Sequence, residues 1–469
     1  MARHERRTFA QRAVMWFTPI VCAALLVGCT VGPNYKRPPV TVPEAYRGAQ
    51  ALAGASIAEQ DWKTMFEDES LRALIAAGLT DNIDVRIAAV RILQADAIYG
   101  VTRSQQFPTV DGEATVQGQR GATPAGFVLP ATGFGQFNVS AAWEVDFWGK
   151  FRRATEGARA QILATEWGRR EVVTRLISEL ATAYYNLRAL DLQLEIAQRT
   201  LTTRRDSLRL ATVRHSSGAT SLVDVRQAEQ LVHTAEGEIV DLRRQIEQQE
   251  NALSFLIGQN PGAITRGRLL VEQALAPDVP AGLPSALLAR RPDVQQAEQQ
   301  IVAANAQIGV ARAAYFPQIT LTGIGGVASN ALSSLFTTGL WAAGANLVQP
   351  IFNAGRTRSQ VRLAEAQTEE AALVYRQTVQ QAFREVSDAL VGYDRSRERR
   401  KTQEALVDAA RDARRLADVR YQGGASSYLE VLDSDTRLFD AELQLVRARL
   451  SELAAFVEVY RALGGGWRA

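Results

Sequence analysis

Two halves of the chain repeat one another at a nearly constant spacing, and this feature restricts the fold more than any other. Two pairs of matching segments lie 209 residues apart, and a later pair lies 206 residues apart. The pairs are Asp84-Val85 with Asp293-Val294, Phe107-Pro108 with Phe316-Pro317, and Arg214–Ser221 with Arg420–Ser427. A long internal repeat indicates that one supersecondary unit was duplicated. We expect each copy to run as helix, two strands, long helix, glycine turn and helix.

The repeat also sets the expected domain boundaries, because a proline-containing stretch separates the two copies. The boundaries are a signal peptide at 1–28, a lipidated N-terminal tether at 29–60, a first repeat at 61–258, a linker at 259–284, a second repeat at 285–466 and a C-terminal tail at 467–469. Proline fixes φ and disfavours helix in the residue before it, so the tether and the linker are expected to be extended.

The charge balance of the chain argues against a nucleic-acid partner. Its 469 residues carry 53 Lys and Arg against 50 Asp and Glu, which gives a formal net charge of +3. Proteins that bind nucleic acid carry a clustered basic surface. The basic run Arg395–Lys401 is most simply a solvated helix face, with a docking surface as the alternative.

The N-terminus has the pattern of an export signal. Four arginines within the first twelve residues precede an apolar run at 13–27, which is too short for a stable transmembrane helix. The segment Leu26–Cys29 resembles the lipobox of bacterial lipoproteins. This resemblance implies that Cys29 becomes the mature N-terminus, with diacylglycerol on its sulfur and a palmitoyl chain on its amine. An ordinary cleaved signal with a chance cysteine is the alternative.

Cysteine usage is consistent with that interpretation. The other cysteine, Cys22, lies inside the expected signal peptide, so the mature chain retains Cys29 alone. It therefore has no pair for a disulfide and no set of thiolates for a metal site. We predict no cofactor and no metal.

Each copy contains two segments that alternate between apolar and polar residues. We predict strands at about 107–119 and 135–147 in the first copy, and at about 316–327 and 340–352 in the second. Runs of about ten residues, apolar on one face and polar on the other, suit a membrane barrel with a wet lumen. Aromatic residues favour the headgroup level, so Trp143, Phe147 and Trp148 are predicted to form a membrane aromatic belt. A half-buried sheet in a soluble protein is the alternative.

Four strands cannot close a barrel within one chain. Open strand edges in hydrocarbon leave N–H and C=O groups unpaired, at several kcal/mol each. The barrel must therefore be shared between chains. Two chains would give eight strands with little open lumen, whereas three would give twelve, so a channel favours three or more copies.

The helices are expected to be long and to form coiled coils. No proline occurs between Gly149 and Val213, and a continuous helix of that length reaches roughly 100 Å. The last helix carries an apolar seam with alternating steps of four and three residues, a heptad pattern that faces a partner helix. The seam consists of Leu432, Thr436, Phe439, Leu443, Val446, Leu450, Leu453, Val457 and Tyr460. An ordinary coiled-coil dimer is the alternative.

In this order and spacing, the motifs resemble the outer-membrane factor family of TolC/OprM/NodT-type efflux lipoproteins over nearly the whole mature chain. The matching segments are Cys29–Tyr35, Asn82–Val85, the two Phe-Pro pairs, Arg291–Val294, Tyr421–Asp433 and Ala462–Trp467. The resemblance implies a mainly α protein with a membrane β-barrel. As a homotrimer it would have a twelve-stranded barrel and a coiled-coil helical barrel that forms a periplasmic tunnel.

The resemblance also implies partners and a function. The chain would sit in the outer-membrane lipid, bind a periplasmic adaptor protein and an inner-membrane efflux pump, commonly of the resistance-nodulation-division type, and export drugs or other small toxic compounds. Type I protein secretion and a non-channel, lipid-anchored coiled-coil scaffold are the alternatives. An enzyme is not expected, because His215 and His233 have no evident catalytic partner and the chain has neither a phosphate loop nor a nucleophile elbow.

By the same resemblance, the second copy carries a periplasmic gate formed by Tyr421, Leu429, Glu430 and Asp433. In a trimer, Glu430 and Asp433 would form rings of carboxylates that suit cation-selective gating. The alternative is that acids simply favour a helix N-terminus. Many relatives have Gln-Arg where this chain has Asp435-Thr436. The part of the gate that depends on this arginine to hold the tips closed is therefore in doubt.

The resemblance further implies that the hairpin turns of both copies form tips that face the adaptor. Their small residues leave backbone accessible for close contact, and the tip residues are Ser217, Gly218, Gly423 and Gly424. The copies are unequal, because Asp224 and Gln227 align with the gate acids Glu430 and Asp433.

Overall fold

The computed structural model describes most of the chain, which forms two compact units. The described residues are 30–48, 56–121, 124, 127, 132–273, 279–330, 336 and 338–467. Unit 1 comprises the described parts of Met1–Pro39, Arg91–Thr165 and Gln296–Tyr375, and unit 2 those of Val40–Val90, Glu166–Gln295 and Arg376–Ala469.

Three pairs of helices have equal lengths in the two copies. α4 (Ile83–Ser104) and α8 (Pro292–Ala313) have 22 residues each, α5 (Lys150–Ser216) and α9 (Arg356–Gln422) have 67, and α6 (Leu222–Leu256) and α10 (Tyr428–Ala462) have 35. No proline interrupts the two longest helices, and 67 residues at the usual rise span about 100 Å. The long helices expected from the sequence are therefore present. None of the described helices combines the length and apolar character needed to cross a bilayer.

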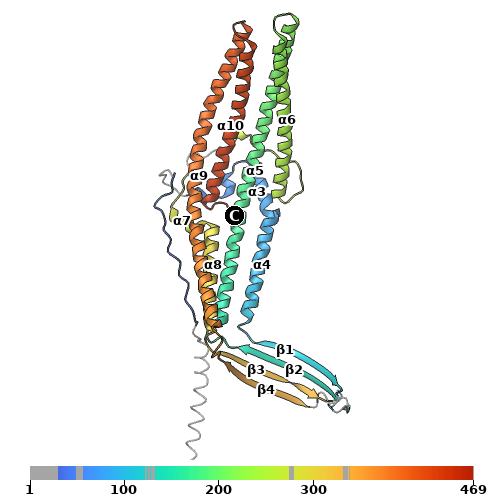
Figure 1. Cartoon of the computed structure of the whole chain (residues 1–469), viewed down its shortest axis with the longest axis vertical. Helices are drawn as coiled ribbons and strands as arrows, with labels where there is room; N and C mark the ends of the chain where they lie inside the picture. Colours follow the sequence, from blue (N-terminus) through green and yellow to red (C-terminus); the bar gives the residue numbers. More distant parts are fainter. Residues whose placement is uncertain are drawn as a thin grey trace, which may run out of the picture. The chain divides into compact units, whose positions relative to one another are not determined.

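Unit 1 contains a four-stranded antiparallel sheet in chain order (Figure 1). The strands are β1 (Thr109–Gln119), β2 (Thr132–Glu144), β3 (Gln318–Ser329) and β4 (Gly339–Val348). The register keeps apolar residues on one face, with Val110 opposite Ala141, Trp143 opposite Leu321 and Gly325 opposite Trp341. On the other face Glu113 lies opposite Asn138. The predicted set of four strands with alternating faces is confirmed, and β1 and β4 form the two edges of the sheet.

Two strands end before the residues at which the sequence pattern predicted their ends, about 147 and 352. β2 ends at Glu144, and the carboxylate of Asp146, two residues later, binds the N-terminus of α5: it accepts hydrogen bonds from the backbone N–H groups of Phe151 and Arg152, at 3.0 and 2.8 Å. β4 ends at Val348, two residues before Pro350, and proline has no N–H to donate to a ladder. The aromatic and apolar residues that follow each strand therefore lie outside the sheet.

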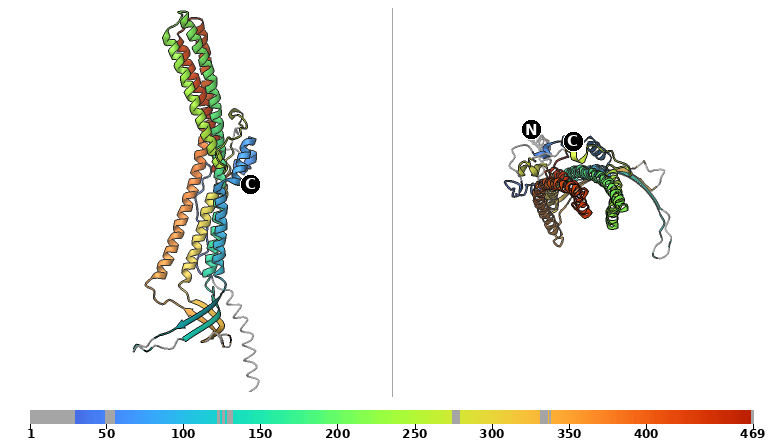
Figure 2. Two further views of the ribbon diagram at one scale, coloured as in Figure 1. Left: turned by 90° about the vertical axis from the view of Figure 1, so that its right-hand side faces the viewer. Right: turned by 90° about the horizontal axis from the view of Figure 1, so that it is seen from above.

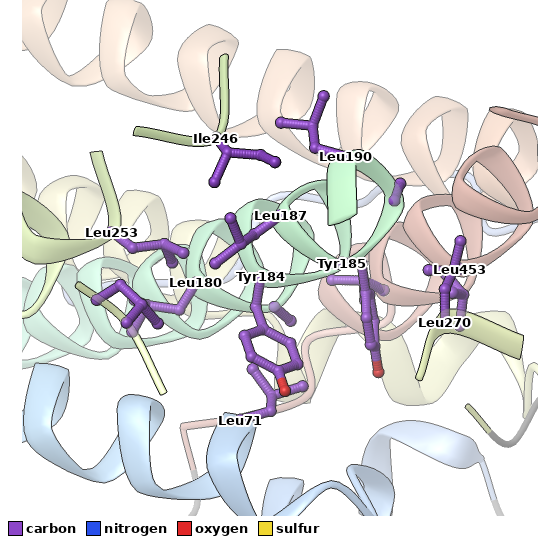
Figure 3. Close-up of a cluster of buried hydrophobic side chains, with 14 of the residues drawn as sticks. Leu71, Leu180, Tyr184, Tyr185, Leu187, Leu190, Ile246, Leu253, Leu270 and Leu453 are labelled. Carbon is purple, nitrogen blue, oxygen red and sulfur yellow. The ribbon is translucent and has the colours of Figure 1, made fainter. Parts of the chain in front are cut away.

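Unit 2 has a hydrophobic core built around α5. Most of its buried residues come from the short helix α3 (Glu69–Asp81) and from α5, α6, α10 and the 3-10 helix η2 (Leu270–Glu272) (Figure 3). Leu71, Tyr184 and Leu253 are less than 1% exposed. The 3-10 helix η1 (Ile57–Glu59), α2 (Trp62–Met65) and α7 (Pro284–Arg290) complete this unit.

Two helical hairpins, α5–α6 and α9–α10, lie side by side in unit 2 (Figure 2). Most of the seam of α10 is buried, since Phe439, Leu443 and Val446 are all less than 9% exposed, whereas Thr436 is exposed. Its other end, with Leu453, Val457 and Tyr460, belongs to the main core. The heptad pattern therefore identified the face of α10 that contacts other helices.

Candidate functional site

The two hairpin turns have the same backbone geometry. Gly218 and Gly424 have φ of +78° and +72°, the left-handed region in which glycine is favoured. The next residue in each turn donates a backbone hydrogen bond of 2.8 Å to the residue five positions earlier, as in the helix-ending Schellman pattern. Ser217 and Gly423, which precede these glycines, are exposed. The duplicated sequence thus produces duplicated tips.

Tyr421 lies where the two hairpins of one chain meet. The guanidinium of Arg214, from α5, lies 4.5 Å from the centre of its ring, and the ring of Tyr428 lies 5.2 Å away. Burial raises the pKa of Tyr428 to about 12, so that phenol stays neutral. Tyr428 also belongs to a small group of buried residues near the tips, which we call the tip cluster. Tyr421 packs against this cluster. Its buried members are Ala211, Ala228, Ala417, Tyr428, Val431 and Leu432. Sequence reasoning selected Tyr421 but missed Arg214 and Tyr428.

The two predicted gate acids lie on the first turns of α10, and each has an arginine beside it. Glu430 is 3.2 Å from Arg420, and Asp433 is 2.7 Å from Arg437. Both acids line a groove of about 670 Å³ between α9 and α10, and the predicted gate residue Leu429 is 61% exposed. The spacing of Asp433 and Arg437 could have revealed their pairing. The Arg420–Glu430 pair could not be predicted from helix spacing, because the glycine turn between α9 and α10 brings its two residues together.

The three predicted belt residues are half-buried around the end of β2. Trp148 stacks on Phe316 with ring centres 4.5 Å apart, and Phe147 meets Trp148 edge-on at 4.7 Å. The indole N–H groups of Trp143 and Trp148 donate to the backbone oxygens of Gln106 and Pro317, at 3.0 and 2.8 Å. Phe316, from the repeated Phe-Pro pair, is a member of this aromatic group that the sequence reasoning did not select.

The predicted lipidation site, Cys29, lies outside the described residues, but the segment that follows it is held against unit 1. The N–H of Val31 donates to the oxygen of Trp148 at 3.1 Å, and Arg153 donates to the side chain of Asn34 at 2.8 Å. Further along, Tyr35 and Arg37 both bind the carboxylate of Glu298. The start of the tether is therefore extended and docked on the helices of unit 1.

No metal-binding group was found within the described residues, where no three His, Cys, Asp or Glu side chains are placed to share an ion. The ring of His215 makes a 3.1 Å hydrogen bond with the backbone oxygen of Thr220, and His233 lies 3.1 Å from Glu236. Both histidines are accounted for by local contacts.

Comparisons with known proteins agree with one another. The sequence model described as outer membrane efflux protein matches residues 74–259 and 283–465. The toluene efflux pump outer membrane protein TtgI of Pseudomonas putida is 37% identical over 464 residues, covering 96% of this chain and 98% of the relative. The cation efflux system protein CusC of Escherichia coli is 33% identical, with the same coverage of both chains.

Solved structures give the same result. A crystal structure of CusC superposes with a TM-score of 0.85 at 31% identity, covering 93% of this chain and all of the other. The open state of the MtrE outer membrane channel of Neisseria gonorrhoeae also gives a TM-score of 0.85, at 30% identity, covering 94% of this chain and 99% of that one.

Proposed function

The chain belongs to the outer membrane efflux protein family, and from this premise we propose that it is the outlet of a three-part efflux system that exports small toxic compounds. Its place is the outer membrane. The observation that carries the proposal is a nearly full-length likeness, in both sequence and structure, to efflux outer membrane proteins and channels. In this role the chain is a passive duct and not an enzyme.

The working assembly is a homotrimer. The edges at β1 and β4 cannot stay unpaired in hydrocarbon. Pairing β1 of one copy with β4 of the next removes every edge, and three copies give twelve strands around an open lumen. The exposed pattern of both strands agrees with their being covered by lipid and neighbouring strands.

A second surface supports contact between copies. α4 exposes Ile83, Ile87 and Val90, which are 55%, 43% and 51% exposed and recur at coiled-coil spacing. α9 exposes Leu363 and Leu373, at 58% and 56%. A soluble monomer rarely leaves an apolar helix stripe in water. These stripes are suited to meet the helices of neighbouring copies in a shared helical barrel.

The proposed cargo is organic rather than metallic. The named relatives include a solvent pump, an antibiotic pump and a cation system. Soft metal ions are carried by thioether and thiolate ligands, and the expected mature chain retains only Met65 and Cys29. This composition favours solvents and hydrophobic drugs. Type I secretion is less favoured, because the matched relatives bear the names of efflux systems.

Within this role, the tips with Gly218 and Gly424 meet the periplasmic adaptor, and an inner-membrane pump supplies the cargo. Tyr421, Leu429, Glu430 and Asp433 form the gate at the periplasmic end. Cys29 carries the lipid that anchors the N-terminus, and the belt residues Trp143, Phe147 and Trp148 sit at the membrane boundary.

A growth assay tests the exported class. Cells that lack the gene are expected to become sensitive to toluene and hydrophobic antibiotics, and the wild-type gene should restore their resistance. Sensitivity to metal salts alone would instead assign the chain to cation export. Unchanged sensitivity to all of these compounds, in cells that have no other outlet, would contradict the proposal.

A further inference from the structure

Two acidic residues on α10 each lie between an arginine of α5 and an arginine of α9. Asp435 is 2.9 Å from Arg204 and 3.4 Å from Arg414. One heptad later, Glu442 is 2.6 Å from Arg199 and 3.8 Å from Arg411. We call these two sets the Asp435 rung and the Glu442 rung. Both rungs connect the first helical hairpin of a chain to its second.

The sequence places the two acids where such contacts form. Each comes directly before a seam residue of α10, Thr436 or Leu443. Positions that flank a coiled-coil seam form ion pairs that set the choice and orientation of the partner helix. Because seven residues separate the two acids, they lie on the same side of α10 and reach the same two neighbouring helices.

The Asp435 rung is the more buried of the two. The side chains of Arg204 and Asp435 are 3% and 13% exposed. Arg204 also donates to the backbone oxygen of Leu231 on α6 at 3.1 Å, and its guanidinium lies 5.0 Å from the ring centre of Phe439. The loss of the carboxylate would leave a buried guanidinium without its counter-charge, which destabilises strongly. Asp435 and Arg204 together thus connect all four helices.

Along α10 the Asp435 rung lies between the tip cluster and the main core, whereas the Glu442 rung lies at the near end of the main core. Tyr428, Val431 and Leu432 of the tip cluster precede Asp435, whereas Phe439 and Leu443 of the main core follow it. Asp433 lies two residues from Asp435, and residues at that spacing do not share a helix face. The proposed gate acid and the rung acid therefore face different surroundings on one helix turn.

We propose that Asp435 and Glu442 are positioning residues for the gate, because they hold the α9–α10 hairpin of each chain to its own α5–α6 hairpin. The inference rests on the proposed function. With both rungs intact, the hairpins of one chain move together and the periplasmic end stays closed. When the rungs are broken, the α9–α10 hairpin moves independently of the α5–α6 hairpin and carries Glu430 and Asp433 with it.

The test uses the full-length protein and near-isosteric changes. In Asp435→Asn/Glu442→Gln, the carboxylates become amides of the same shape. The matched control is Glu236→Gln, which removes a 2.7 Å ion pair with Arg205 inside the first hairpin. Amide hydrogen exchange of residues 208–214 and 428–434 reports separation of the α5–α6 hairpin from the α9–α10 hairpin, and it does not require the protein to conduct. We expect exchange in the double variant to be about tenfold faster than in wild type, because local opening becomes easier.

The salt dependence of hydrogen exchange distinguishes the loss of an electrostatic contact from general misfolding of the variant. Arg199 and Arg411 are more than half exposed, so the Glu442 rung is screened by salt, while the Asp435 rung is screened much less. Glu442→Gln alone should therefore speed exchange at low salt and match wild type near 1 M salt. Asp435→Asn alone should differ from wild type under both conditions.

Channel recordings of the same proteins complete the test. Faster exchange together with a raised open fraction in the double variant, and neither change in Glu236→Gln, supports the proposal. Unchanged exchange overturns it, as does faster exchange with an unchanged open fraction. If no protein conducts, including Asp433→Ala, the proposed function fails, and the exchange data alone decide whether the rungs join the hairpins.

Discussion

The hydroxyl of Tyr184 donates a 2.9 Å hydrogen bond to the carboxylate of Asp68, which joins α5 to the residue that caps α3. The same carboxylate oxygen accepts the backbone N–H of Arg268 and the side-chain amide of Gln273, at 2.9 and 2.8 Å. Asp68 is 1% exposed. One buried carboxylate therefore ties the linker between the two copies to the first repeat.

Asp68→Asn should lower the free energy of unfolding by about 3 kcal/mol. An amide nitrogen in place of the shared carboxylate oxygen cannot accept the hydrogen bonds from Tyr184, Arg268 and Gln273. Chemical denaturation of the purified protein measures the change. Glu67→Gln is the matched control, because it removes the exposed Glu67–Arg268 pair of 2.7 Å and should change the unfolding free energy by less than about 1 kcal/mol. Equal effects of the two changes would contradict the role given to Asp68.

The contribution of Asp68 should depend on pH in a predictable direction. Burial tends to raise its pKa, but hydrogen bonds from Gln273, Tyr184 and the backbone of α3 outweigh burial and lower it. A lowered folded-state pKa gives stability that is present above the unfolded value of about 3.9 and is lost as the pH falls through the folded-state value. The difference between wild type and Asp68→Asn should shrink below about pH 4, and a constant difference would argue against this linkage.

Two helical glycines should respond to alanine in opposite ways. A Cβ on Gly309 would lie 2.7 Å from the oxygen of Val31, so Gly309→Ala should displace the tether and expose the bond after Lys36 to trypsin. Gly157 has room, with its nearest neighbours at 3.4 Å, and Gly157→Ala should stabilise α5 by up to about 1 kcal/mol. The cleavage rate and the melting temperature measure the two effects. A tether in Gly309→Ala as resistant as in wild type would refute the close contact.

Cys29→Ser should abolish incorporation of labelled palmitate while leaving part of the protein in the outer membrane, because the strands also hold it there. Membrane fractionation with metabolic labelling measures both quantities. Cys22→Ser is the control and should keep the label. Normal labelling of Cys29→Ser would disprove the anchor.

Asp433→Ala should raise the uptake of large antibiotics that cross the outer membrane poorly. It removes one acid of the proposed ring together with the 2.7 Å pair to Arg437. Asp440→Ala changes an exposed acid one heptad further along the same groove and should leave uptake unchanged. If antibiotic uptake rises by a similar amount in both variants, the cause is the loss of negative charge in the groove and not a specific role of Asp433 in the gate.

The sequence predicted those features that depend on local period. The absence of proline predicted α5, the alternation of side chains predicted the faces of the sheet, and the heptad steps of α10 predicted the helix face that is mostly buried. Each of these patterns is contained in one contiguous segment. The glycine turns at Gly218 and Gly424 were likewise expected from the repeat, and both glycines have positive φ in the structure.

Contacts across large separations could not be predicted in this way. Asp435 was noted only as a departure from relatives, yet it meets Arg204, which is 231 residues away. Glu298 holds the tether through Arg37, 261 residues away, and Asp68 meets Gln273 at a separation of 205. Local propensity carries no information about such pairs, because they depend on how the helices associate.

The ion conductance of the purified full-length protein in a planar lipid bilayer tests directly whether this chain forms a gated channel. An outlet closed by a gate should give rare, discrete openings in wild type, and Glu430→Ala/Asp433→Ala should open more often and to a larger conductance. Failure of both proteins to produce any current steps, although trimers are present in the membrane, would contradict the assignment of this chain as an efflux channel.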